Sequence, residues 1–161
     1  MISEAAERLG RFSCRHLRFI LAASSGLVIA VSLIAPLLCS SGLEGISDLL
    51  YSIGKGICHQ QVDRCIAVGP HHTAVCARCF GGYAGFLISS LVFSNRIRMP
   101  KWVVSVIAVG AIASVVDIIL HMLHIYDTGN LYRLISGFLT GMGLGMVVFG
   151  FVSVIERRQS I

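Results

Sequence analysis

The run "FILAASSGLVIAVSLIAPLLC", from Phe19 to Cys39, is 21 residues long and contains no charged side chain. A helix of about 20 apolar residues is long enough to cross the roughly 30 Å hydrocarbon core of a bilayer. The run therefore predicts a transmembrane helix over residues 19–39. We expect this helix to stay on the chain as an anchor, because no A-x-A cleavage site follows it.

The composition of the whole chain agrees with this prediction. Of its 161 residues, 55% are hydrophobic and 13% are charged, and the mean hydropathy is +0.82. Soluble domains have about 25% charged residues. The net charge of +5 comes from basic residues that flank apolar runs, so we predict no nucleic-acid partner. The six cysteines do not indicate a secreted disulfide scaffold, because the chain is not rich in loops.

Three further apolar runs follow the first one. Backbone polar groups must be satisfied within the segment itself in lipid, so each run is expected to be helical. We predict an all-α, polytopic membrane protein that forms a single membrane domain over residues 1–161. Its four transmembrane helices are expected at about 19–39, 75–95, 102–126 and 131–155. The long loop at about 40–74 contains a stretch with helical apolar spacing, Leu43–Ile57, which predicts an interfacial helix.

The basic residues predict the orientation, because Lys and Arg concentrate in cytoplasmic segments. Nine of them flank the predicted helices on one side and two lie in the 40–74 loop on the other. The nine are Arg8, Arg11, Arg15, Arg18, Arg96, Arg98, Lys101, Arg157 and Arg158, and the two are Lys55 and Arg64. Both termini are therefore expected in the cytoplasm, and the long loop is expected to be extracytoplasmic.

The extracytoplasmic loop and the start of the second helix carry ligands that suit a transition metal. Cys58 and His59 are followed by a Cys-x-x-Cys pair, Cys76 and Cys79, and two ligand pairs separated by a loop are typical of tetrahedral zinc sites. We expect Thr73 to cap the second helix, so that Cys76 and Cys79 share a face of its first turns. We predict that Cys58, His59, Cys76 and Cys79 bind zinc, and thiolate with imidazole also suits iron or copper. Further side chains of the same types lie nearby: Cys65, His71 and His72.

These motifs resemble those of a family of small prokaryotic membrane proteins, domain of unknown function 2085. The resemblance covers roughly residues 55–145. It rests on "CHQ" at 58–60, Arg64, "CARC" at 76–79, Gly81 or Gly82, Tyr83, Gly85, Asp117, Arg133, Ser136 and Gly137. Cys65 stands where that family usually has a small polar residue, so Cys65 is not assigned as a ligand. The resemblance implies an architecture and site residues, and it carries no activity.

Ionisable residues inside the predicted membrane segments indicate a second polar region. Asp117, His121 and His124 share one face of the third helix, and Arg133 opens the fourth. Charged side chains at membrane depth usually face a partner or a cavity. The directions of the side chains argue against a simple Asp117–Arg133 ion pair. We therefore expect Arg133 to meet Asp127, a lipid phosphate or another anionic ligand.

Glycines spaced four residues apart predict how these groups come together. Gly81 and Gly85 on the second helix, and Gly137, Gly141 and Gly145 on the fourth, form small-xxx-small faces that allow close helix approach. This packing would bring Arg78 and Arg133 to the rim of one outer pocket. The thiols would lie at its mouth, and Asp117 and His121 would lie deeper.

Three functions fit this pattern. The first is a membrane metalloprotein in which the ion holds the loop on the second helix. The second is a metal-dependent enzyme acting on a lipid or lipid phosphate, in which Arg78 and Arg133 bind the anion and Asp117, His121 or Arg133 takes part in catalysis. The third is a thiol–disulfide oxidoreductase built on the cysteines. The expected partners are the bilayer and an anionic lipid or phosphate ligand, and a homo-oligomer is compatible with the pattern.

Overall fold

The computed structural model describes residues 2–92, 101–123 and 129–158. The helices and strands, in chain order, are α1 (Ile2–Ser40), α2 (Glu44–Lys55), a short 3-10 helix η1 (Val62–Arg64), β1 (Cys65–Val68), β2 (His71–Cys76), α3 (Ala77–Val92), α4 (Lys101–Met122) and α5 (Asn130–Arg158). The structure is therefore mostly helical, as the sequence predicts, and the helix expected within the long loop is present as α2.

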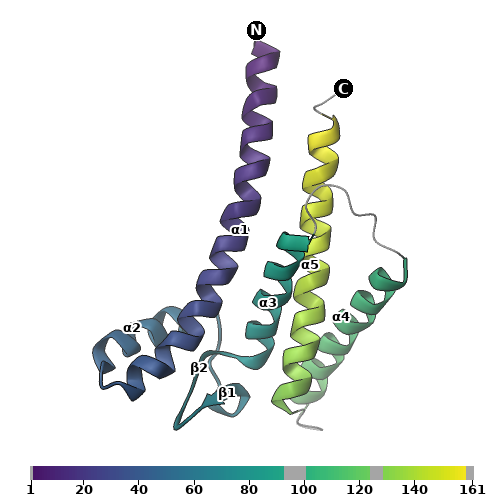
Figure 1. Ribbon diagram of the computed structural model, residues 1–161. Coiled ribbons are helices and arrows are strands. Elements are labelled where there is room, and N and C mark those ends of the chain that lie inside the picture. The colour runs from purple at the N-terminus through teal and green to yellow at the C-terminus, as the bar shows by residue number, and fades with distance from the viewer. Residues whose placement is uncertain (1, 93–100, 124–128, 159–161) are drawn as a thin grey trace.

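The long helices form a bundle, and the connecting loop folds over one end of it (Figure 1). Helix α3 packs against α5 and α1, and α4 packs against α5. Helix α2 and the β1–β2 hairpin lie together at one end of the bundle. Helix α1 begins and α5 ends at the opposite end of the bundle (Figure 1). All residues of the loop between α1 and α3 are thus gathered on the side away from the basic N-terminal segment.

Glycines hold α3 and α5 in backbone contact, as their spacing predicts. A Cβ atom added to Gly81 would overlap the Leu134 carbonyl oxygen, and one added to Gly137 would overlap the Arg78 carbonyl oxygen. Because backbone atoms cannot move aside as a flexible side chain does, no larger residue fits at these positions without separating the helices. The contact places Arg78, on the first turn of α3, directly beside α5.

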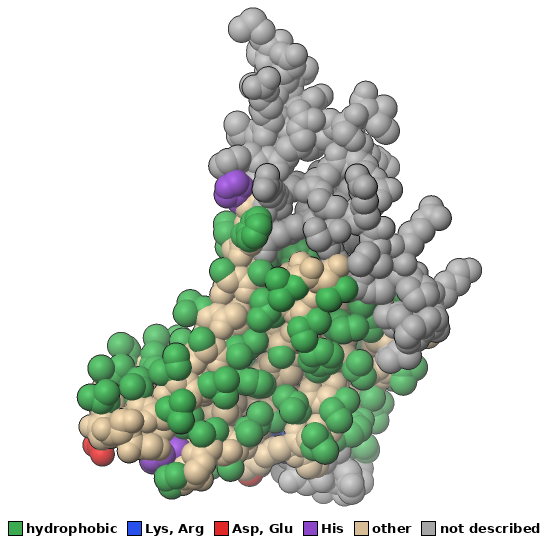
Figure 2. Space-filling model, in the orientation of Figure 1, with side chains coloured by type: hydrophobic (Ala, Val, Ile, Leu, Met, Phe, Trp, Pro, Cys, Tyr) green, Lys and Arg blue, Asp and Glu red, His purple; other side chains and the backbone are tan. Residues whose placement is uncertain are grey.

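Many large hydrophobic side chains are exposed on the described bundle, and they cover much of the face seen in Figure 2. Leu27, Val109, Leu131 and Val147 are 65–70% exposed, which is unusual in number and size for a water-soluble monomer. Two helical segments are long and apolar enough to cross a membrane, Phe19–Ser40 and Asn130–Phe149, with mean hydropathies of 2.2 and 1.4. The apolar segments Ala77–Val92 and Ile107–Leu120 are shorter within the described residues.

The start of the second predicted helix differs from expectation. Residues 71–76 form strand β2, so α3 begins at Ala77 rather than near residue 75, and Thr73 lies in the strand instead of capping the helix. The Thr73 hydroxyl donates to the Val75 carbonyl at 2.8 Å and accepts from the Ile66 amide at 3.1 Å. The Thr73 hydroxyl thus finds both of its hydrogen-bond partners within the hairpin, and it does not cap α3. The turn between the strands contains Gly69, whose φ of +60° favours glycine.

Candidate metal centre

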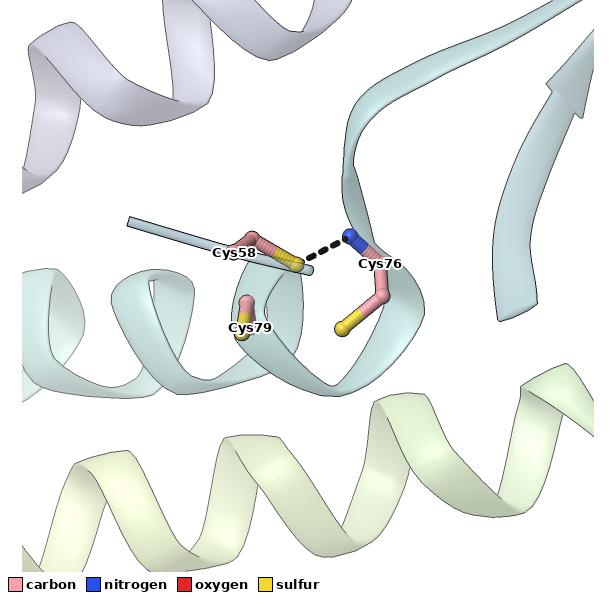
Figure 3. Close-up of side chains that lie close together, drawn as sticks. All are labelled: Cys58, Cys76 and Cys79. Atoms are coloured by element: carbon pink, nitrogen blue, oxygen red, sulfur yellow. Dashed lines mark hydrogen bonds between the residues drawn. The ribbon is translucent and has the colours of Figure 1, made fainter. Parts of the chain in front are cut away.

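Three cysteines from three different parts of the chain meet at the hairpin end of the bundle. The sulfur atoms of Cys58, Cys76 and Cys79 all lie within 4.8 Å of one another. Figure 3 shows Cys58 on the loop, Cys76 at the end of β2 and Cys79 on the first turn of α3. Of the described residues, these form the group whose ligand atoms are close enough to hold one metal ion.

The loop is fixed so that the Cys58 sulfur faces the other two. The Cys58 amide donates to the Gly54 carbonyl at 2.9 Å, which ties this cysteine to the end of α2. Two residues later, the Gln60 side-chain amide donates to the Tyr51 carbonyl at 2.7 Å and to the Ala74 carbonyl at 2.5 Å. Gln60 therefore links α2 to β2 around the cysteine, and its backbone has a φ of +47°.

The surroundings of Cys58 favour its thiolate. The backbone amide of Cys76 donates to the Cys58 sulfur at 3.3 Å (Figure 3). Hydrogen bonds from the thiols of Cys76 and Cys79 lower the pKa of Cys58 well below its ordinary value, against the opposing effect of burial. Because a thiolate is the form that binds metal and attacks disulfides, the cluster is prepared for either chemistry.

The other predicted ligand types lie outside this group. His59 is exposed although it adjoins Cys58, and its ring nitrogens are not among the clustered ligand atoms. Cys65 is buried, and that burial raises the pKa of its thiol to about 11, so Cys65 is protonated at neutral pH. His72 contacts Tyr51 edge-to-face, with ring centroids 5.4 Å apart, and the Tyr51 hydroxyl donates to its carbonyl.

An ionic group lies directly beside the thiols. Arg78, between Cys76 and Cys79 in the chain, pairs with Asp117 of α4, whose side chain is 2% exposed. Arg133 is buried in the first turn of α5, and its Nη1 donates to Asn130 Oδ1 at 3.5 Å. Arg64 and Arg133 both lie within electrostatic range of Arg78. Arg78 and Asp117 thus pair between α3 and α4, and Arg133 of α5 lies near them.

Part of the predicted pocket lies outside what the structure describes. His121 belongs to α4, and its side chain lies outside what the structure describes. His124 and Asp127 also lie outside the described residues. The predicted roles of these side chains, and of Arg78, Arg133 and Asp117 toward a ligand, stay predictions.

Three contacts were not anticipated from the sequence. They are the Gln60 bridge, the Arg78–Asp117 pair and the bond from the Asn130 side chain to the Cys65 carbonyl at 3.0 Å. The Gln60 bridge reaches Ala74 on β2, so it depends on the β1–β2 hairpin. Gly69-Pro70, between two short stretches containing β-branched residues, was the available signal for that hairpin. The other two contacts join residues that are 39 or more positions apart and have no local signature.

The comparisons with known proteins place the site within a family. A family model described as "Predicted membrane protein (DUF2085)" matches residues 58–147, a range that begins at Cys58 and includes Cys76, Cys79, Asp117 and Arg133. An uncharacterized protein of Methanocaldococcus jannaschii is 32% identical over 102 residues, which are 60% of this chain and 64% of that relative. The match thus spans less than two thirds of the relative's length. No solved structure matches the chain.

Proposed function

This chain belongs to the DUF2085 family of predicted membrane proteins, and we propose that it is a multi-pass metalloprotein in which Cys58, Cys76 and Cys79 bind zinc. The observation that carries the proposal is the convergence of three sulfurs from a loop, a strand and a helix. Buried single cysteines usually act as small apolar side chains. Three that converge, with an amide donating to one of them, are typical of a metal-thiolate site.

The membrane arrangement that we propose has four spans, formed by residues 19–40 of α1 and by α3, α4 and α5. The hydrophobic exterior and the apolar character of all four segments support it. Both termini are placed in the cytoplasm, because the N-terminal arginines and the end of α5 lie at the end of the bundle away from the hairpin. The thiol cluster then lies on the extracytoplasmic side.

Three thiolates leave one position of a tetrahedral zinc ion. We propose His59 for this position, because it adjoins Cys58 and is the nearest imidazole in the chain. Its exposed ring would have to turn toward the sulfurs when the ion binds. A zinc site with four protein ligands is structural, because it leaves no position for a substrate. Here the ion would fix the loop and β2 to α3.

Metal content tests this function directly. The full chain, purified in mild detergent without chelator, reductant or added metal, is expected to contain about one zinc ion per chain by plasma mass spectrometry. Cys76→Ser is expected to lose most of that zinc, because serine is a poor ligand for this ion. Cys39→Ser is the matched control, since Cys39 lies in α1 outside the cluster, and its zinc content should equal that of the native chain.

One feature of the hairpin favours a second function, thiol–disulfide exchange. Cys65 and Cys76 are direct partners in the β1–β2 ladder, and opposed residues in such ladders have Cα atoms about 4.5–5.5 Å apart. That separation is within the range that a disulfide spans. The two thiols would reduce a partner disulfide to two thiols and become linked. A native chain that is free of metal and carries a mapped cysteine disulfide, with its fold intact, would favour this function over zinc binding.

A further inference from the structure

A groove of about 590 Å³ lies between α1, α3, α4 and α5. Its volume is within the roughly 300–1,000 Å³ of ligand-binding cavities. Val115, Ile118 and Leu144 line the groove and are also 54%, 41% and 58% exposed. The groove is therefore open on the hydrophobic side of the bundle, the side that faces lipid in the proposed membrane arrangement.

The serine and threonine hydroxyl groups in the groove wall are already hydrogen-bonded within their own helices. Ser25 donates to the Leu21 carbonyl at 2.9 Å, Ser114 to the Gly110 carbonyl at 3.1 Å, and Thr140 to the Ser136 carbonyl at 2.8 Å. Because these donors are used internally, the serines and threonines add little capacity to bind a polar molecule, and Tyr83 carries the remaining hydroxyl of the lining. The wall suits an apolar chain along most of its length.

One end of the groove is different, because Arg78 and Cys79 line it there. The Arg78 Nε atom is buried and has no hydrogen-bond partner among the described residues. Arg64 and Arg133 add positive charge nearby, and Asp117 is the buried carboxylate that opposes them. Arg64 is itself paired with exposed Asp63 at 3.8 Å, so Arg78 and Arg133 are, among the described residues, the two cations that face this one buried carboxylate. This end is therefore electropositive.

We propose that the groove binds a lipid phosphate, with its apolar chain along α3, α4 and α5 and its phosphate at Arg78. From Arg78 to Phe86, the lining residues of α3 extend about 12 Å along the helix. Arginine binds phosphate oxygens through paired hydrogen bonds, and Arg78 has a donor still available for one. The proposal rests on the proposed membrane insertion and not on the zinc ion, although the phosphate would lie next to Cys79.

Binding to the full chain in detergent tests the proposal, with native mass spectrometry as the readout. Phosphatidic acid is the probe, phosphatidylcholine with the same acyl chains is the comparison, and inorganic phosphate tests whether the chain is needed. Phosphatidic acid is expected to bind about 10- to 100-fold more tightly than phosphatidylcholine, because its phosphomonoester carries more negative charge and has no choline cation beside it to repel Arg78. Inorganic phosphate is expected to bind far more weakly than phosphatidic acid.

Two neighbouring isoleucines of α4 give a matched pair of variants. Ile118 lines the groove and Ile119 does not, and both are partly exposed, at 41% and 50%. Ile118→Trp is expected to weaken phosphatidic acid binding about tenfold by filling the groove, whereas Ile119→Trp should bind like the native chain. Arg78→Gln should abolish the preference for phosphatidic acid over phosphatidylcholine.

Zinc content measured on the same samples separates the two proposals. A zinc-loaded chain that binds both lipids equally, or binds phosphatidic acid equally well in Ile118→Trp and Ile119→Trp, overturns the groove proposal alone. A zinc-free chain that still shows both differences supports the groove and overturns the metal function. Strong binding of inorganic phosphate that Ile118→Trp leaves unchanged would show an anion site without a lipid groove, which also overturns the proposal.

Discussion

Gln60 shows how a single side chain positions the thiol cluster. It follows Cys58 by two residues, and its amide nitrogen donates to one carbonyl on α2 and to one on β2. Both accepting groups would lose a partner if the side chain were removed. The third residue of the "CHQ" motif thus has a structural explanation, since it holds the loop that presents the first cysteine.

We expect Gln60→Ala to destabilise the protein by about 1–3 kcal/mol, the usual cost of leaving buried polar groups unpaired. The thermal transition in detergent and the zinc content should both fall. Gln61→Ala is the control, because Gln61 is an exposed neighbour whose side chain makes no capping bond to η1. Gln60→Gly relieves the positive φ but not the lost bonds, so a fully stable Gln60→Gly would show that backbone strain, and not the bridge, is responsible.

At the scale of helices, the close contact between α3 and α5 determines how the site is assembled. A Cβ atom on Gly141 would overlap the carbonyl oxygen of Gly82, and one on Gly85 would overlap that of Phe138. These contacts bring the Cys-x-x-Cys turn of α3 next to Arg133 on α5. They also form one wall of the groove, because Gly82 and Gly141 both line it. The glycine faces are therefore structural, and the site depends on them.

We expect Gly141→Ala to lower stability by about 1–3 kcal/mol, as overpacking commonly does, because the added methyl group meets backbone that cannot rotate away. Gly26→Ala is the matched control in α1, another long apolar helix. Its added Cβ would lie 4.0 Å from the nearest atom, Leu87 Cδ2, and alanine is the better helix former. Thermal unfolding in the same detergent compares them, and equal transition temperatures for the two variants would contradict the close packing.

At the scale of the whole molecule, the two ends of the bundle carry different groups. The hairpin, α2 and the three clustered cysteines lie at one end, and the basic start of α1 lies at the other. The surface between the ends is hydrophobic. In a bilayer, this arrangement puts all of the described thiol cluster on one face of the membrane.

Site-directed labelling checks the orientation. In a background without native cysteines, Ala67→Cys, at the exposed position of β1, should react with a membrane-impermeant thiol reagent added outside the cell. Asn95→Cys, between α3 and α4, should react only after the membrane is opened. Removing the native cysteines is acceptable here because flanking charges, rather than the metal, set the orientation at insertion. The reverse labelling pattern would place the cluster in the cytoplasm.

The sequence by itself determined the helices, the helix within the long loop and the close α3–α5 contact. Apolar runs such as Phe19–Cys39 and repeated glycines such as Gly137 and Gly141 are local or periodic signals. Their effect on helix formation and close packing does not depend on the path of the loops between the helices. The sequence also predicted that Cys58, Cys76 and Cys79 come together, because two motifs rich in metal-ligand types stand one short loop apart, and their sulfurs do lie close to one another.

Only the tertiary structure decided which partners those residues meet. Arg78 pairs with Asp117, the sulfurs converge while His59 is exposed, and strand β2 displaces the expected cap at Thr73. Each outcome depends on the path of a loop or on the rotation of a helix about its axis. Those are settled by contacts among residues far apart in the chain, and the spacing of residues along one segment carries no information about them.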